Sequence, residues 1–180
     1  MSRLVVLRLG HRSTRDKRVT THCGLVGRAF GADSMYYFGD KDETVENSIK
    51  KVVENWGGDF KVEWKQDPLQ FINKWKREGG VCVHCTMYGV NINKMQGELR
   101  RMLSKKDIAI IIGASKVPLD IYKASDYNIA VGNQPHSEIA ALAIVLDRIF
   151  KGKELVATFK DAKIKIIPKK EGKEVSRIEE

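Results

Sequence analysis

The sequence of 180 residues has little that would suit an exported or membrane-bound protein. It holds only three cysteines, an odd number, and its opening stretch SRLVVLRLGHR lacks the sustained apolar run of a signal peptide. No apolar run approaches the length of a membrane span, and the longest lies in the segment IAALAIVL. We therefore expect a soluble protein in the reducing environment of the cytoplasm, without a membrane partner.

The common nucleotide-binding and metal-binding patterns are also missing. There is no GxGxxG after the first apolar run and no GxxxxGK[ST] anywhere, so a standard dinucleotide site or a P-loop is not expected. Cys82, His84 and Cys85, with His22 and Cys23 further away, raise the question of zinc. In a strand, however, Cys82 and His84 would point one way and Cys85 the other. We therefore expect no metal and interpret the cysteines as small apolar residues.

The chain does have a large excess of positive charge. Thirty-two Lys and Arg stand against 23 Asp and Glu, which gives a net charge of +9. Much of this charge lies in RLGHRSTRDKRVTTH, residues 8–22, directly behind the first apolar run. Such a balance favours a polyanionic partner such as nucleic acid, although Lys- and Glu-rich surfaces are also common in thermophile proteins.

Six apolar runs of strand length recur along the chain, and most are separated by helical segments. The runs cover residues 4–9, 34–38, 60–64, 81–85, 107–113 and 127–132. Helices are indicated by a capping box at Asp40 and Glu43, by Asp67 before Pro68, by apolar spacing over 92–103, and by a segment from about 135 to 150. This alternation predicts one α/β domain over residues 1–150, with a mostly parallel sheet flanked by helices.

Residues 151–180 differ in character from the rest. Two short alternating segments lie around Lys160, Asp161 and Ala162, and a charged tail follows, so we expect a small β hairpin-like appendage. The helix before it, from about Pro135 to Phe150, has almost no polar face. It should therefore be buried all round, either in the core or between two copies of the chain.

Three loops that follow predicted strands are candidates for a ligand site. They are CTMYG (85–89), GASKVP (113–118) and VGNQPHSEIAAL (131–142). Ligands of open α/β sheets bind where strands end, and the glycines of these loops would let backbone come close to a ligand. Any single glycine could equally do no more than end a strand. Because all three loops share the pattern, we expect them to line one pocket.

The loop sequences carry a resemblance to a known family. GASKVP followed by NIAVGNQPHSEIAALAIVLDRIF is similar to the C-terminal motifs of the SPOUT superfamily of S-adenosylmethionine-dependent RNA methyltransferases. With RLGHRSTRDKRVTTH and VHCTMYG, residues 1–150 resemble the archaeal tRNA ribose 2'-O-methyltransferases that modify the T-loop cytidine at tRNA position 56. The resemblance implies a SPOUT-type domain with a deep trefoil knot, a homodimer, tRNA as substrate and S-adenosylmethionine as cofactor.

Carried over by position, the resemblance assigns the cofactor contacts to the three loops. The implied contacts are Cys85, Thr86, Met87, Tyr88, Gly113, Ala114, Ser115, Lys116, Val117, Val131, Gly132, Asn133, Gln134, Pro135, His136, Ser137 and Glu138. Among these, we expect His136 to be a loop histidine with an ordinary hydrogen bond and not a catalyst.

The resemblance also implies an arginine near the N-terminal motif that is central to catalysis. The candidates are Arg12, Arg15 and Arg18, with Arg28 a weaker one. A guanidinium is a poor proton acceptor, so such an arginine should orient a phosphate or stabilise developing negative charge. The proton acceptor would then be another group, and His22, His11 or water could serve.

Two other functions stay open at the level of sequence. The chain could be a SPOUT methyltransferase that acts on a different RNA nucleotide, or a non-catalytic RNA-binding module whose basic segment only grips phosphate. The tryptophans fall at positions that could equally be core, so they indicate no stacking platform. RNA binding should depend on phosphate charge and weaken with salt.

Overall fold

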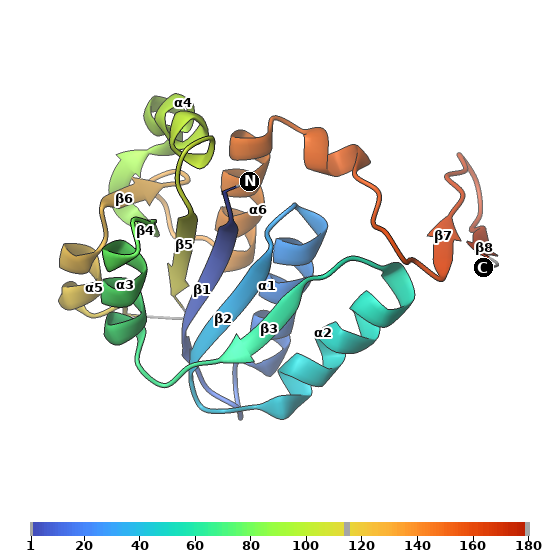
Figure 1. Cartoon of the computed structure of the whole chain (residues 1–180), viewed down its shortest axis with the longest axis horizontal. Coiled ribbons are helices and arrows are strands. Elements are labelled where there is room, and N and C mark those ends of the chain that lie inside the picture. Colours follow the sequence, from blue (N-terminus) through green and yellow to red (C-terminus); the bar gives the residue numbers. More distant parts are fainter. Residues whose placement is uncertain (1, 114–115, 179–180) are drawn as a thin grey trace.

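A parallel sheet of six strands forms the centre of the computed structural model, which describes residues 2–113 and 116–178. The spatial order of the strands is β3-β2-β1-β5-β4-β6 (Figure 1). The strands are β1 (Leu4–His11), β2 (Ser34–Gly39), β3 (Lys61–Trp64), β4 (Val81–Asn91), β5 (Ile108–Gly113) and β6 (Tyr127–Ala130). The predicted fold class, a mostly parallel sheet in an α/β domain, is confirmed.

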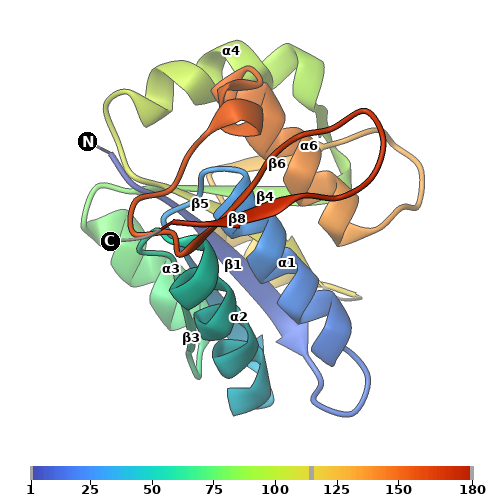
Figure 2. The ribbon, with the colours of Figure 1, turned by 90° about the vertical axis from the view of Figure 1, so that its right-hand side faces the viewer.

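Helices cover both faces of this sheet (Figures 1 and 2). They are α1 (Lys17–Ala29), α2 (Glu43–Trp56), α3 (Pro68–Arg77), α4 (Ile92–Leu103), α5 (Leu119–Ala124), α6 (Glu138–Phe150) and the 3-10 helix η1 (Lys153–Val156). Helices α1, α2, α4 and α6 share one hydrophobic core, whereas α3 and α5 pack into another on the opposite face. No helix of the described residues is both long and apolar enough to cross a bilayer.

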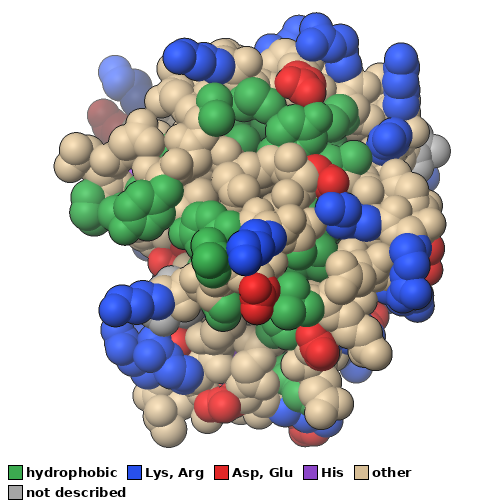
Figure 3. Space-filling model, turned by 90° about the vertical axis from the view of Figure 1, so that its left-hand side faces the viewer, with side chains coloured by type: hydrophobic (Ala, Val, Ile, Leu, Met, Phe, Trp, Pro, Cys, Tyr) green, Lys and Arg blue, Asp and Glu red, His purple; other side chains and the backbone are tan. Residues whose placement is uncertain are grey.

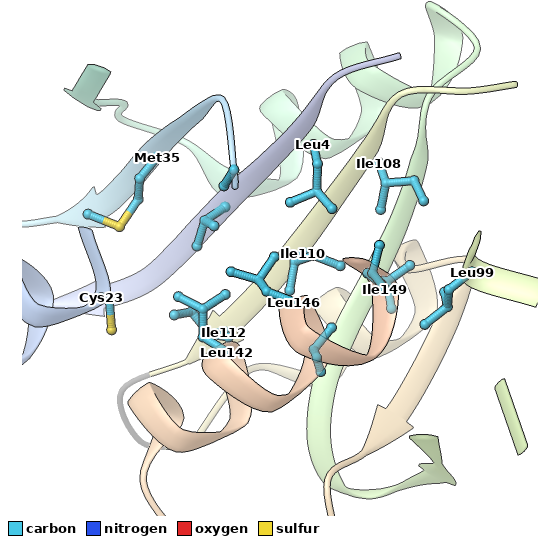
Figure 4. Close-up of a cluster of buried hydrophobic side chains, with 14 of the residues drawn as sticks. Leu4, Cys23, Met35, Leu99, Ile108, Ile110, Ile112, Leu142, Leu146 and Ile149 are labelled. Atoms are coloured by element: carbon cyan, nitrogen blue, oxygen red, sulfur yellow. The ribbon is translucent and has the colours of Figure 1, made fainter. Parts of the chain in front are cut away.

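The alternation of side chains along the strands explains the two cores. In β1, Leu4 and Val6 belong to the core under α1 and α6, whereas Val5 and Leu7 belong to the core under α3. Figure 4 shows side chains of β1 and β5 meeting Leu142 and Leu146 of α6. This packing fixes α6 against the centre of the sheet, with its first residues near the carboxyl ends of the strands.

Two predicted helix starts are corrected by the structure. Helix α2 is capped by Asp42, whose side chain accepts a hydrogen bond from the Thr44 amide, and not by Asp40. Asp40 instead accepts hydrogen bonds from the amide and hydroxyl of Ser13, at 2.9 and 3.2 Å. Helix α6 begins at Glu138 with Ser137 as its cap, so Pro135 lies before the helix and not in its first turn.

Of the two alternatives for the burial of α6, complete burial in the core of one chain does not occur. Leu142, Val145 and Leu146 face the core, but Ala140 is exposed and Ile144 retains 40% of its accessible surface. The helix therefore has an apolar stripe that the chain itself does not cover.

Helix α1 was not predicted, because charged and glycine residues obscure its pattern. Its glycines allow close packing: a Cβ at Gly24 would lie 3.0 Å from Ile49 Cδ1 of α2, which is a tight contact. The glycines lower the intrinsic helix propensity of α1 but let it approach α2 closely.

The tail forms the expected hairpin, but at a different place. Strands β7 (Ile164–Ile166) and β8 (Val175–Arg177) pair antiparallel, so the turn does not fall at Lys160–Ala162. The carbonyl of Lys160 instead accepts a hydrogen bond of 2.8 Å from the Gly58 amide, which ties the tail to the end of α2.

Candidate active site

A cavity of about 590 Å³ opens at the carboxyl end of β5, beside a bulge within β4, and the three predicted loops meet in it. This volume is typical of sites for nucleotide-sized ligands. Figure 3 shows this side of the molecule, where a recess lies between a group of hydrophobic side chains and a group of Lys and Arg. The sequence-based expectation of one shared pocket agrees with this geometry.

Most of the residues assigned to the cofactor by resemblance lie in the wall of this cavity. They are Cys85, Thr86, Met87, Tyr88, Gly113, Lys116, Val117, Val131, Gln134, Pro135, His136 and Glu138. Gly132, Asn133 and Ser137 are not in the wall, and Ala114 and Ser115 lie outside the described residues. Asn133 has a supporting place, since its Nδ2 donates to the Met87 carbonyl at 2.7 Å and holds two of the loops together.

Gly89 sets the shape of the first loop. The pairing of β4 with β6 shifts register between Cys85 and Val90, so the loop bulges out of the sheet. A Cβ at Gly89 would lie 2.5 Å from the carbonyl carbon of Ile129, which is closer than real Cβ atoms come to backbone. Only glycine therefore allows β6 to run so close to this loop.

Four wall residues were not among the predicted contacts: His84, Ile112, Tyr122 and Ala141. His84 is fully buried, and its Nδ1 lies 2.9 Å from Asn128 Oδ1. Because that amide oxygen can only accept, Nδ1 carries the proton and Nε2 presents a lone pair. Nε2 is buried and has no partner among the described residues. Burial lowers the pKa of His84, although the hydrogen bond that its ring donates to Asn128 acts in the opposite direction, so the ring is neutral near pH 7.

Tyr122 connects His84 to the first loop. Its ring meets the His84 ring edge-on, with centroids 4.6 Å apart, and its hydroxyl lies 2.9 Å from Thr86 Oγ1. No local sequence pattern indicated this arrangement, because the contact joins segments 36 residues apart. The result is a fixed polar cluster at one end of the cavity.

An ion pair that sequence reasoning missed includes one residue of the cavity wall, Glu138. Arg8 of β1 is fully buried, and its Nη2 lies 3.1 Å from Glu138 Oε1 at the start of α6. Its Nη1 donates to the carbonyl of Leu9. In the sheet, Arg8 stands beside Ile112 of β5, which lines the cavity.

The basic segment leaves the sheet at the same edge as the cavity. Leu9 of β1 pairs with Gly113 of β5, so the loop after β1 begins next to the second pocket loop. Arg12 Nε lies 2.8 Å from Asp16 Oδ2, and this hydrogen bond is the main cause of the lowered pKa of Asp16. Arg15 reaches the same carboxylate only at 3.8 Å. Arg18, on α1, is exposed and has no side-chain partner among the described residues.

The remaining candidates for catalysis, His22, His11 and Arg28, differ in burial. His22 is exposed on α1, whereas His11 is buried, with Nδ1 2.8 Å from Thr20 Oγ1 and a pKa lowered mainly by desolvation. Arg28 is also buried, and its Nη2 donates to the carbonyls of Trp56 and Gly57, both at 2.7 Å. These contacts give Arg28 a structural place at the end of α2, which argues against its weaker candidacy for catalysis.

His136 is exposed, and its Nδ1 lies 3.1 Å from the Ser137 carbonyl, a local contact of an ordinary loop histidine. Over residues 2–113 and 116–178, no three His, Cys, Asp or Glu side chains gather as a metal site would require. Cys82 and Cys85 belong to opposite sides of the sheet.

Comparison with known proteins agrees with this geometry. A family model described as tRNA ribose 2'-O-methyltransferase, aTrm56, matches residues 56–176. A tRNA (cytidine(56)-2'-O)-methyltransferase of Methanocaldococcus jannaschii is 55% identical over 172 residues, which cover 96% of this chain and 95% of the relative.

Two solved structures share the fold at low sequence identity. The A. aeolicus TrmH/SpoU tRNA modifying enzyme has a TM-score of 0.59 and 16% identity, over 86% of this chain and 77% of its own. The SpoU methyltransferase AviRb of Streptomyces viridochromogenes, in complex with the cofactor AdoMet, has a TM-score of 0.55 and 15% identity, over 83% and 58% respectively.

Proposed function

The chain belongs to the tRNA ribose 2'-O-methyltransferase family, and we propose that it methylates the ribose of the cytidine at tRNA position 56 with S-adenosylmethionine as donor. The observation that carries this proposal is the cavity, built from the bulge within β4 and the loops that follow β5 and β6, and bordered by the basic segment after β1. A cofactor site and a polyanion site thus meet at one edge of the sheet.

The residues of the cavity fit a nucleoside with a cationic side chain. Ile112, Val117 and Val131 supply aliphatic walls for a purine. Glu138 adds a carboxylate. When bound, S-adenosylmethionine supplies an electrophilic methyl group on its sulfonium.

The protein has to align the ribose hydroxyl and stabilise the charge that develops on its oxygen. Of the three candidate arginines we favour Arg18 for this work, because Arg12 and Arg15 already contact Asp16. A guanidinium that is free of other partners can bind a phosphate with two hydrogen bonds. Burial removes His11 as a proton acceptor, which leaves His22 or water.

A direct test uses tRNA, donor labelled in the methyl group, and mass spectrometry of the digested product. We expect one methyl group on the ribose of the cytidine at position 56. Single replacements Arg12→Ala, Arg15→Ala and Arg18→Ala should leave donor binding intact, and Arg18→Ala should lower the rate most. Full activity in all three variants would refute the assignment of these arginines.

The same assay separates the alternatives. Methylation at another nucleotide would retain the enzyme class and change the target. Donor binding without methyl transfer to any RNA would favour a non-catalytic RNA-binding module. Binding of tRNA should weaken steeply as salt rises, because phosphate contacts release counterions.

The homodimer, the knot and a cytoplasmic location are parts of this proposal. The uncovered stripe of α6, with Ala140 and Ile144 exposed, supports an interface with a second copy. Sedimentation of the unmodified chain and of Ile144→Glu tests the interface: we expect a dimer for the first and a monomer for the second.

A further inference from the structure

Arg8 is a charged residue at a position that the fold otherwise fills with apolar side chains. It lies on the same side of β1 as Leu4 and Val6, which belong to the core under α1 and α6. Its side chain has no accessible surface, and its Nε has no hydrogen-bond partner among the described residues. A buried cation of this kind is costly unless an anion lies beside it.

Glu138 is that anion, and it also faces the cavity. It is the only carboxylate among the described residues of the cavity wall, and its side chain retains 21% of its accessible surface. The pair with Arg8 uses Oε1. Oε2 accepts no hydrogen bond from the described residues, so it is free to face a ligand.

The position of Glu138 also indicates which part of a ligand it meets. Through Arg8 it is attached to β1, the strand that leads into the basic segment. Glu138 therefore lies on the side of the cavity from which the RNA must approach. The transferable methyl group has to face the RNA, so the charged sulfur must lie on this side too.

We propose that Glu138 is a specificity-determining residue that recognises the positive sulfur of the donor, and that Arg8 is a positioning residue that holds the Glu138 carboxylate in place. This inference rests on the proposed function, because it presupposes a sulfonium donor. The carboxylate attracts S-adenosylmethionine, whose sulfur is charged, more than S-adenosylhomocysteine, whose sulfur is neutral. The site thereby favours the donor over the product that remains after methyl transfer.

A simpler role for Glu138 would be structural. An acidic residue in the first turn of a helix is favourable in itself, and the ion pair neutralises Arg8. Under that role, replacing Glu138 would weaken the donor and the product equally. The ratio of their two affinities therefore separates recognition of the sulfur from support of the fold.

The experiment is calorimetric titration of the full chain with S-adenosylmethionine and with S-adenosylhomocysteine, without RNA. Glu138→Gln should lower the preference for the donor by about tenfold, as expected for loss of one charge interaction in a partly buried site. Glu43→Gln is the matched control, since Glu43 is also the first residue of a helix but lies outside the cavity wall. It should leave the preference unchanged.

Two further variants protect the test against a failure to fold and examine Arg8. Arg8→Met combined with Glu138→Gln leaves no buried charge, and it should show the same tenfold loss of preference. Arg8→Met alone should lower the preference in part, and Arg8→Lys should restore most of it. An unchanged ratio in both Glu138 variants, or an equal loss for both ligands, would overturn the assignment of Glu138. A full preference in Arg8→Met would overturn the positioning role. Failure of the unmodified chain to bind either ligand would instead refute the proposed function.

Discussion

The pair between Arg8 and Glu138 predicts a marked asymmetry in stability. Arg8 is fully buried, whereas Glu138 keeps 21% of its accessible surface. The loss of stability therefore depends on which of the two charges is left without its partner. Removing one partner of a buried ion pair costs about 3–5 kcal/mol, chiefly because the other charge stays buried without compensation. Glu138→Gln strands the buried cation, and we expect a loss near the lower limit, about 3 kcal/mol, because glutamine still offers a hydrogen-bond acceptor.

Arg8→Met should cost less, because the stranded carboxylate of Glu138 can be hydrated from the cavity. We expect about 1–2 kcal/mol, since the methionine also fills the space with apolar atoms. The double variant should lie close to the unmodified chain, so the two effects should not add.

Urea unfolding of the four proteins, followed by circular dichroism, measures these differences. For a domain of this size, about 3 kcal/mol corresponds to a fall in Tm of roughly 6–12 °C. A greater loss for Arg8→Met than for Glu138→Gln, or simple additivity in the double variant, would refute the reasoning.

Four other predictions follow from local geometry and burial. Gly89→Ala would force a Cβ to within 2.5 Å of the backbone of β6. Titration calorimetry should show donor binding weakened at least tenfold, which is about 1.4 kcal/mol. At Gly97 a Cβ meets nothing within 4 Å, so Gly97→Ala should instead stabilise the folded chain by about 0.5–1 kcal/mol. Burial lowers the pKa values of His11 and His84 below the ordinary value of a histidine. The unfolded chain therefore binds protons first as the pH falls, so Tm should be level above about pH 7 and fall below about pH 6.5. A level Tm down to pH 5 would contradict this. Burial raises the pKa of Cys23 to about 12, so this thiol should resist alkylation at pH 8 until the chain is unfolded in urea, as peptide mass spectrometry would show.

The strands and the pocket loops could be predicted because their signals are local. Apolar runs of five or six residues followed by glycine mark buried parallel strands and their carboxyl ends, and parallel strands bring those ends to one edge. The cap of α2 was misplaced by two residues, since Asp40 and Asp42 are equally suitable by sequence and only the contact of Asp40 with Ser13 decides between them.

The polar cluster at His84 and the pair at Arg8 could not be predicted from local signals, because each depends on a partner far along the chain. Arg8 and Glu138 are 130 residues apart. One weak signal was present: in LVVLRL, Arg8 has the same parity as Leu4 and Val6, so a strand that is buried on both faces must bury this arginine. A buried arginine in a central strand requires an anion, and that requirement alone would have justified a search for a carboxylate in the loops.

The arginines of residues 8–22 differ in burial and in their contacts, and these differences decide how readily each can bind RNA. Arg8 cannot leave its carboxylate to bind RNA, because breaking the pair would leave a buried charge with neither solvent nor a counter-ion. Arg12 and Arg15 share one carboxylate, that of the mostly buried Asp16, but their own side chains keep 40% and 71% of their accessible surface. Water can therefore solvate either guanidinium once it leaves Asp16, and each can exchange that contact for a phosphate at a smaller cost than Arg8. Arg18 has no such contact to give up. The cost of release therefore falls along the segment from β1 into α1, and the arginine most available to the substrate is the one furthest from the buried pair.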